Sequence, residues 1–447
     1  MGRARSGARE IAYQVLTSIE EKDAFMDRAL DAALGHYPQM DERERALATE
    51  LAYGVTRQQG VLDRIISDHS RTPLEEMDCA VLRILRLGAY QILFLDRIPD
   101  HAAVSQSVEL AKRCCPLGSP AFLNAVLRAI CRNKNSRKTM SILGAAEEGQ
   151  PAWLVELWKR ELGDDQARVL LRAIESQPET VLRVNLLKTG QETLLEELER
   201  EGYNVTSFSG LPGALRMIRG GDVRRSEAHR SGRILQQDAA SQLVTWILDP
   251  CPGHRILDCC AAPGVKTTHI NEKMEGRGLV VAVDRHPGRL RDLVRLCEHM
   301  GAATVLPVCA DASVQGGLPL KDVLFDRVLV DVPCSGLGTL RRTPERKWRD
   351  VPRFSELASL QLGILEEASR RLTPGGILVY STCTVVRGEN EVVLERFFSK
   401  RKDFILENAS LGLPEAFQDL VCERGFFRSW LRPSACDYFF AARLRRL

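Results

Sequence analysis

The sequence predicts a multidomain protein: an all-α N-terminal part, a small α/β segment and a C-terminal α/β domain with a Rossmann-like fold. Three observations support this fold class. The chain has 447 residues, more than one hydrophobic core usually supports. Apolar residues recur at helical spacing from residue 4 to about 135. From residue 233 onward, short apolar runs alternate with helical stretches, and several of the runs end at an aspartate. We therefore expect domains at 1–140, 151–232 and 233–447.

Composition narrows the class of protein. Hydrophobic residues make up 44% and charged residues 27% of the chain, as in soluble globular proteins. The net charge is only +3, so any affinity for nucleic acid must come from local basic patches. No apolar run approaches the roughly 20 residues of a membrane span, and the first residues lack the apolar core of a signal peptide. We expect a cytoplasmic protein that does not engage a membrane.

The cysteines favour reduced thiols. There are thirteen of them, an odd number, and no two stand in a Cys-x-x-Cys spacing. Disulfide frameworks and zinc sites usually show paired or closely spaced cysteines. The sequence therefore predicts free thiols and no metal site.

The N-terminal part is expected to be a bundle of amphipathic helices. Residues 8–19 carry the first apolar stripe, at i, i+3, i+4 and i+7 spacing. Similar stripes recur in four later stretches, at Ala46–Val55, Cys79–Leu95, Ala102–Ala111 and Phe122–Ile130. A polar stretch at 136–150 reads as a linker.

The following segment, 151–232, mixes helices and strands. We expect helices at 153–160, 165–176 and 192–202, and strands at 181–185, 203–208 and 215–218. Such a segment could pack domains together or bind nucleic acid. Five arginines could contact phosphates, namely Arg183, Arg216, Arg219, Arg224 and Arg225.

In the C-terminal domain, a helix through Trp246 precedes a series of strands that end in polar residues. The strand 255–258 ends at Asp258, and Asp284, Asp311 and Asp331 follow the strands at 279–283, 304–309 and 325–330. A fifth strand, 376–380, leads into Ser381-Thr-Cys-Thr384. Ligands of open α/β sheets bind at the carboxyl ends of the strands, so these side chains mark a predicted site.

The loop after the first strand indicates the kind of ligand. Small residues and Gly264 allow a ligand to approach the backbone, and Lys266 begins a helix whose amide groups face that ligand. The loop is not Gly-x-Gly-x-x-Gly, which disfavours a dinucleotide. Asp284 stands about 20 residues beyond it, where such folds place an acid on ribose hydroxyls. S-adenosylmethionine fits this pattern better than NAD or ATP.

The stretch Val328–Gly338 places a carboxylate, a thiol and a tight turn at the end of one strand. Asp331 and Cys334 are candidates for chemistry at this position. Considered alone, they are also compatible with a turn-capping aspartate and a small buried cysteine.

Three motifs in order, Leu257–His269, Asp331–Gly338 and Tyr380–Thr384, resemble the RNA 5-methylcytosine methyltransferases. The order of helical segments in the N-terminal part, ending in Phe122–Arg128, resembles the helical domain of the NusB family, which binds RNA. Together these features resemble the bacterial members that act on small-subunit ribosomal RNA (Sun or Fmu type). Val265 departs from the family pattern, which usually has a second glycine there, and Tyr438 replaces a common glycine.

The resemblance implies a reaction and roles for individual residues. Cys383 matches the cysteine that attacks cytosine carbon 6, Asp331 would hold the base, and Cys334 would assist loss of the carbon 5 proton. The substrate would be a cytosine of 16S ribosomal RNA, and the protein a monomer. Positions matching S-adenosylmethionine contacts are Cys260, Ala261, Ala262, Pro263, Gly264, Val265, Lys266, Asp284, Arg289, Asp311 and Asp331. A tRNA-directed enzyme of the same chemistry and a non-catalytic RNA-binding adapter remain alternatives.

The resemblance also suggests where RNA is held. A basic cluster at the end of the helical part comprises Arg128, Arg132, Lys134, Arg137 and Lys138. A solvated helix end would carry the same residues. A second set follows the stretch Val328–Gly338 and could grip flanking nucleotides, namely Arg341, Arg342, Arg346, Lys347 and Trp348, although Trp348 could equally be a core residue.

Overall fold

The computed structural model describes residues 7–136, 139–140, 147–320, 322–432 and 436–447. The chain forms two compact units. The helical unit comprises Met1–Gln177 and Leu340–Asp350, and the sheet unit comprises Pro178–Thr339 and Val351–Leu447. The predicted division at 1–140, 151–232 and 233–447 stays a proposal; by compactness, residues 151–177 group with the helical unit.

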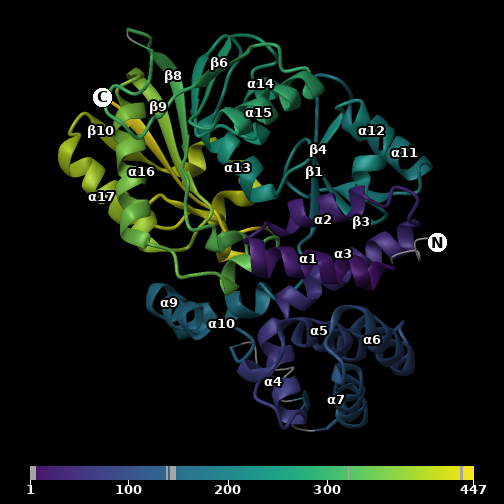
Figure 1. Ribbon diagram of the computed structural model, residues 1–447. Helices are drawn as coiled ribbons and strands as arrows, with labels where there is room; N and C mark the ends of the chain where they lie inside the picture. The colour runs from purple at the N-terminus through teal and green to yellow at the C-terminus, as the bar shows by residue number, and fades with distance from the viewer. Residues whose placement is uncertain (1–6, 137–138, 141–146, 321, 433–435) are drawn as a thin grey trace. The chain divides into compact units, whose positions relative to one another are not determined.

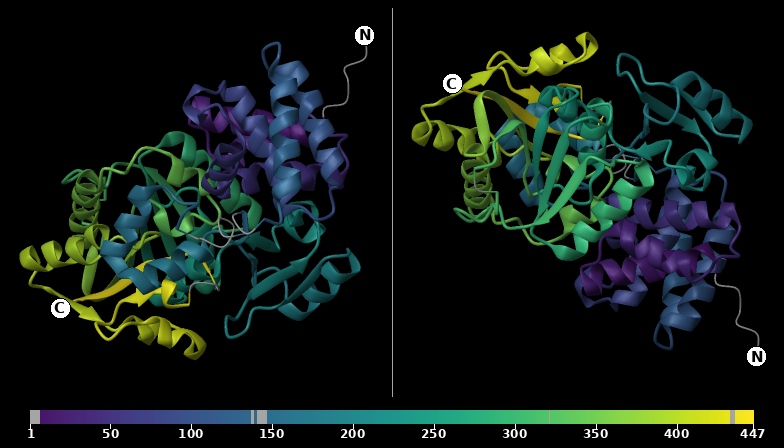
Figure 2. Two further views of the ribbon diagram at one scale, coloured as in Figure 1. Left: turned by 90° about the horizontal axis from the view of Figure 1, so that it is seen from below. Right: turned by 90° about the horizontal axis from the view of Figure 1, so that it is seen from above.

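The helical unit confirms the prediction of an all-α N-terminal part (purple to blue in Figures 1 and 2). Aspartates cap two of its helices, because the side chain of Asp41 accepts from the amide of Glu44 and that of Asp78 accepts from Ala80. The predicted stripe of the first helix is buried at five positions from Ala8 to Leu16. Its helices are α1 (Ala8–Lys22), α2 (Met26–Gly35), α3 (Glu42–Arg57), α4 (Gln59–His69), α5 (Cys79–Phe94), α6 (Asp100–Cys114), α7 (Ser119–Asn133), α9 (Ala152–Leu162) and α10 (Asp164–Ala173).

The sheet unit contains a small antiparallel sheet with strand order β2-β3-β1-β4. Its strands are β1 (Thr180–Val184), β2 (Asn204–Ser207), β3 (Ala214–Arg219) and β4 (Ile234–Gln236), with α11 (Gln191–Arg200) and α12 (Glu227–Arg230) between them. Three of these strands match the predicted ones closely. β4 was not predicted, because its three residues form a strand only through pairing with β1, where Leu182 faces Gln236.

The large sheet has the order β10-β12-β9-β8-β5-β6-β7, and β11 pairs with β12. Strands β5 to β9 run parallel, whereas β12 and β10 are antiparallel to their neighbours. These strands are β5 (Arg255–Cys259), β6 (Leu279–Asp284), β7 (Val305–Cys309), β8 (Phe325–Asp331), β9 (Leu372–Thr382), β10 (Phe404–Glu407), β11 (Phe427–Arg428) and β12 (Phe440–Arg446). The predicted Rossmann-like domain is confirmed.

Five helices pack on this sheet, namely α13 (Ala239–Leu248), α14 (Val265–Lys273), α15 (Pro287–Met300), α16 (Phe354–Ser369) and α17 (Glu391–Lys400). Figure 1 shows α14 and α15 beside β6, and α16 beside β9. Strand order reverses between β5 and β8, which is the position where open α/β sheets bind ligands.

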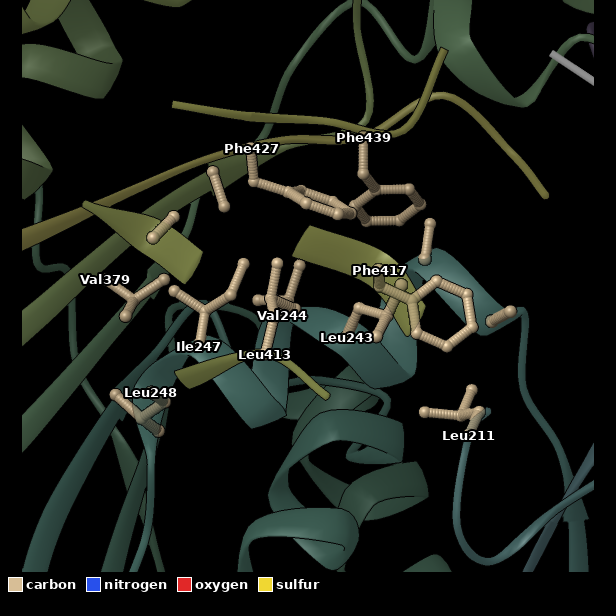
Figure 3. Close-up of a cluster of buried hydrophobic side chains, with 14 of the residues drawn as sticks. Leu211, Leu243, Val244, Ile247, Leu248, Val379, Leu413, Phe417, Phe427 and Phe439 are labelled. Atoms are coloured by element: carbon tan, nitrogen blue, oxygen red, sulfur yellow. The ribbon is translucent and has the colours of Figure 1, made fainter. Parts of the chain in front are cut away.

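The core of the sheet unit surrounds α13 (Figure 3). Leu243, Val244 and Ile247 of this helix pack with Val379 of β9 and Phe427 of β11. Nearly every residue of α13 is buried, including the polar residues Ser241, Gln242 and Thr245. In the described parts of the chain, no helix combines the length and apolar character that a membrane span requires.

Candidate active site

The site lies at the carboxyl ends of β5, β6, β8 and β9. Asp331, the last residue of β8, accepts one hydrogen bond from Lys266 Nζ at 2.7 Å and another from Ser381 Oγ at 2.7 Å. Lys266 is the second residue of α14. Burial lowers its pKa, but Asp331 and then Cys383 favour the charged ammonium and raise it overall. Lys266 therefore stays protonated between a carboxylate and a thiol.

Two cysteines from different strand ends meet beside Asp331. The Sγ atoms of Cys334 and Cys383 lie 3.3 Å apart, and the amide of Cys383 donates to Cys334 Sγ at 3.3 Å. The hydrogen bond to Cys383 and then burial raise the pKa of Cys334. The Cys334 thiol is therefore less acidic than an ordinary thiol, and either sulfur can donate the hydrogen bond between them.

The loop between β5 and α14 has the conformation that its small residues allow. Cys260 has φ of +62° and Gly264 has φ of +104°, both in the left-handed region. A side chain at Gly264 would come within 3.0 Å of Leu293 on α15, so the glycine permits this close approach. Ala261 donates to the carbonyl of Val283 at 2.9 Å, which ties the loop to β6.

Asp284 ends β6 and is 3% exposed. Its carboxylate accepts hydrogen bonds from the amides of Ala262 at 3.3 Å and His286 at 2.9 Å. Arg289 of α15 donates to the carbonyl of Ala262, and its guanidinium lies 4.0 Å from Asp284. The loop, Asp284 and Arg289 thus form one connected wall.

This wall borders a hollow at the strand ends. Asp311 accepts from the hydroxyl of Ser313 at 2.6 Å and from its amide at 2.8 Å, and these two bonds lower the pKa of Asp311. Apolar side chains complete the lining opposite the acids. The hollow is lined by Cys260, Val283, Asp284, Arg285, His286, Arg289, Ala310, Asp311, Ala312, Ser313, Pro333, Leu360 and Ile364. Two acids and an apolar wall suit a ligand with hydroxyl groups and a flat ring.

The structure brings the predicted site residues into two adjoining groups. Cys260, Asp284, Arg289 and Asp311 line the hollow. Cys334 and Cys383 lie beside Asp331. Lys266, just after the loop between β5 and α14, donates a hydrogen bond to Asp331. The remaining predicted residues belong to the intervening loop and the start of α14, namely Ala261, Ala262, Pro263, Gly264 and Val265.

Comparison with known proteins places the chain in a family. The family model "16S rRNA methyltransferase RsmB/F" matches residues 245–445, a NusB family model matches 6–132, and a ferredoxin-like domain model of RsmF/B-like methyltransferases matches 150–224. A probable ribosomal RNA small subunit methyltransferase B of Synechocystis sp. is 35% identical, covering 98% of this chain and 99% of that protein. The chain belongs to the ribosomal RNA small subunit methyltransferase B family.

Two further comparisons support this assignment. The corresponding probable methyltransferase of Bacillus subtilis is 33% identical, covering 90% of each chain. The crystal structure of PH0851 superposes with a TM-score of 0.79 at 25% identity and covers 100% of both chains. Membership of this family supports S-adenosylmethionine-dependent methylation of RNA, and the helical unit contains the family's NusB-like domain.

Five residues between Arg341 and Trp348 were predicted to grip RNA, and for two of them this prediction is wrong. Arg341 and Lys347 are buried at 3% and 1% exposure. Lys347 Nζ donates to the carbonyl of Arg57 and to Gln150 Oε1, each at 2.8 Å. Trp348 Nε1 donates to the carbonyl of Thr56 at 2.8 Å, which agrees with its alternative reading as a packing residue. This segment is part of the helical unit, although in sequence it follows Asp331 and Cys334 of the sheet unit.

The prediction that Arg183 contacts phosphate is also wrong. Its guanidinium is 1% exposed and donates to Glu272 at 2.9 Å, to Thr268 Oγ1 at 2.8 Å and to the carbonyl of Val265 at 2.7 Å. By contrast, Arg219, Arg224 and Arg225 are exposed. In the helical unit Arg128 and Arg132 are exposed and Lys134 pairs with Asp100 at 2.8 Å, whereas Arg137 and Lys138 lie outside the described residues.

Sequence reasoning missed a set of buried polar residues that surrounds the two cysteines. Its members are Ser335, Gln361, Tyr380, Thr382, Thr384, Glu389 and Asn390. The adjacent polar residues of the Glu389-Asn-Glu391 triplet are the signal that could have indicated part of this set. Polar residue types next to a strand end read as exposed loop, so only the fold reveals their burial.

Proposed function

We propose that this protein transfers a methyl group from S-adenosylmethionine to carbon 5 of a cytosine in 16S ribosomal RNA, through a covalent adduct between Cys383 and carbon 6. One observation carries the proposal. Two thiols with sulfur atoms 3.3 Å apart lie beside a carboxylate that is held by a lysine whose side chain is 13% exposed. Packing alone gives no reason to assemble these four groups at a sheet's ligand-binding edge.

The hollow beside the cysteines fits the proposed methyl donor. Asp284 and Asp311 can accept hydrogen bonds from ribose hydroxyls and from an ammonium group, respectively, while Pro333, Leu360 and Ile364 offer apolar surface to an adenine ring. Arg289 donates a hydrogen bond to the loop between β5 and α14 and lies near Asp284. Its guanidinium is therefore not placed to bind a phosphate group of a ligand. When bound, S-adenosylmethionine supplies an electrophilic methyl group.

Carbon 5 of cytosine is a poor nucleophile, and the residues of this site can change that. In the proposed reaction the Cys383 thiolate adds to carbon 6, and the electron pair of the 5,6 double bond becomes available at carbon 5. Asp331 would accept a hydrogen bond from the amino group of the base and pass a proton from Lys266 to N3, which neutralises the negative charge that develops on the ring as the thiolate adds. Lys266 and Ser381 fix the Asp331 carboxylate for this contact.

After methyl transfer, carbon 5 carries a proton that must leave. Cys334, after losing its own proton to water, would accept the carbon 5 proton as a thiolate. The electron pair of the carbon–hydrogen bond restores the 5,6 double bond, the carbon–sulfur bond breaks, and Cys383 leaves as a thiolate. The raised pKa of Cys334 suits this assignment, since a less acidic thiol forms a stronger base.

The identity of the RNA rests on family membership. Relatives that align over nearly the whole chain are ribosomal RNA small subunit methyltransferases B, which favours 16S ribosomal RNA over tRNA. The assembled thiol pair disfavours a non-catalytic adapter. We further propose a cytoplasmic monomer.

A direct test uses the purified full chain, unmodified 16S ribosomal RNA and S-adenosylmethionine. Bisulfite sequencing of the product should show one protected cytosine that is absent when the methyl donor is omitted. If tRNA transcripts are modified and 16S ribosomal RNA is not, the result would favour a tRNA-directed enzyme of the same chemistry. Modification of neither RNA by a folded protein would favour the adapter.

A further inference from the structure

Two consecutive residues, Glu389 and Asn390, are bonded to the neighbours of both cysteines. They lie between β9 and α17, and each is 0% exposed. Burying a carboxylate and an amide costs free energy unless their polar atoms are hydrogen-bonded. Their partners therefore show which parts of the site they hold.

The Glu389 carboxylate holds the turn that carries Cys334. Glu389 Oε2 accepts from the amide of Ser335 at 2.9 Å, and Oε1 accepts from its hydroxyl at 2.5 Å. Gln361 of α16 donates to Glu389 Oε2 at 2.9 Å and to the carbonyl of Pro333 at 3.0 Å. The residues on both sides of Cys334 are thereby fixed through one carboxylate.

The Asn390 amide holds the strand end that carries Cys383. Asn390 Oδ1 accepts from Thr382 Oγ1 at 2.6 Å, and Nδ2 donates to the carbonyl of Thr384 at 3.0 Å. The residues on both sides of Cys383 are thus fixed as well. The Ser335 hydroxyl lies 2.9 Å from Thr384 Oγ1 and links the two halves.

One peptide bond therefore connects the group that holds Cys334 to the group that holds Cys383. We propose that Glu389 and Asn390 are positioning residues that set the separation of the two thiols, and we call this pair the clamp. The importance of the clamp for methyl transfer rests on the function proposed above. Reactive groups must be held to within about 0.5 Å, and a misplacement of about 1 Å can lower a rate about a hundredfold.

The separation of the thiols can be measured without RNA or a methyl donor. Diamide oxidises two neighbouring thiols to a disulfide and takes up the two hydrogens at its N=N bond. At 3.3 Å the sulfurs need only a small shift to reach the roughly 2.0 Å of a disulfide bond. The rate is followed in the full chain by mass spectrometry of the peptide pair that links Cys334 to Cys383.

Four variants and a matched control define the expected result. Glu389→Ala and Asn390→Ala should each slow formation of this disulfide at least about tenfold. Glu389→Gln should give an intermediate rate, because its amide oxygen still accepts from Ser335. The control is Glu391→Gln, since Glu391 is also buried but pairs with Arg428, and it should oxidise like the wild type. Ser335→Ala, which removes the hydroxyl that links the halves, should behave like Glu389→Gln.

The methylation assay separates this proposal from the proposed function. If the clamp positions the thiols, Glu389→Ala should lower kcat while KM for RNA stays unchanged. A Glu389→Ala protein with the wild-type Tm and the wild-type disulfide rate would overturn the clamp, whatever the activity. If the Glu389→Ala variant forms the disulfide slowly but the wild-type protein never methylates carbon 5, the clamp is supported and the proposed function is rejected. If Glu389→Ala does not fold, the rates of Glu389→Gln and Ser335→Ala decide in the same way.

Discussion

Arg183 and Glu272 form a buried ion pair, with Nη2 and Oε1 2.9 Å apart, between the small sheet and the helix that follows the ligand loop. Glu272 loses its partner in an Arg183→Met variant. We expect a loss of about 3–5 kcal/mol in the free energy of unfolding, because a buried carboxylate is left uncompensated. Urea titrations should show this loss.

The double variant Arg183→Met/Glu272→Met is the control for that prediction. It removes both charges, so it should recover much of the stability. If the single variant matches the wild type, the ion pair does not hold the small sheet to α14.

Arg183 also shows where sequence reasoning stops. The local sequence was enough to predict that β1 is a strand. The burial of Arg183 in this strand, however, depends on Glu272, which lies 89 residues further along the chain. Lys347 is a similar case, since its acceptor, the carbonyl of Arg57, is 290 residues away. A basic residue in a short motif reads as a nucleic-acid contact until such a distant partner is known.

The strand-end residues were predictable for the opposite reason. Asp284, Asp311 and Asp331 each follow an apolar run, and parallel strands deliver their carboxyl ends to one edge regardless of distant detail. Local pattern therefore predicted that these residues share one edge of the sheet, whereas the clamp at Glu389 and Asn390 required the fold. The antiparallel strand β10 was also missed, because it forms by pairing with β12, which in turn pairs with β9.

The second prediction concerns the methyl donor. Asp284→Ala should weaken binding of S-adenosylmethionine by about 1.5–3 kcal/mol, the usual contribution of a charged hydrogen-bond acceptor. Calorimetry on the folded variant measures this loss. Asp292→Ala, which alters a largely exposed acid of α15, serves as the control and should bind normally. Unchanged affinity in Asp284→Ala would remove Asp284 from the proposed site.

The third prediction is a pH dependence from Asp258. Burial raises the pKa of this carboxyl to about 7, from an ordinary value of 3.8. The folded state therefore holds a proton that the unfolded state releases, and Asp258 stabilises the fold fully only below about pH 4. This stabilisation should decline as pH rises to about 7 and then level off.

An Asp258→Asn variant isolates this effect. Asparagine keeps an oxygen that can accept from Thr267 Oγ1, which lies 2.6 Å from Asp258 Oδ2. The difference in unfolding free energy between wild type and variant should shift by a few kcal/mol, on the order expected for such a pKa change, between pH 4 and pH 7. A constant difference across this range would show that Asp258 is ionised in the fold.

The fourth prediction concerns the segment Leu340–Asp350. Lys347→Ala leaves the carbonyl of Arg57 and the amide oxygen of Gln150 without their donor, which should cost about 1–3 kcal/mol. The segment should loosen, and trypsin should cut the full-length variant faster at Arg346 and Arg349. Cleavage at the exposed Arg277 should be the same in both proteins. Equal cleavage at all three sites would mean that Lys347 does not anchor the segment.

The last prediction separates the two thiols. Both follow strand ends, and their sulfur atoms lie 3.3 Å apart, so position alone does not distinguish them. The proposed reaction does, because Cys383 forms the bond to carbon 6 and Cys334 assists its release. Cys383→Ala should neither methylate RNA nor form a covalent adduct with it. Cys334→Ala should attack and methylate the base but release it slowly, since the base that removes the carbon 5 proton is missing.

Denaturing gels with radiolabelled RNA distinguish these outcomes. A protein–RNA band should appear with Cys334→Ala and should be absent with the double variant, which lacks the attacking sulfur. A band that instead accompanies Cys383→Ala would reverse the two roles. If neither variant traps RNA and both still methylate it, no thiol adduct forms, and the close approach of Cys334 to Cys383 must have another cause.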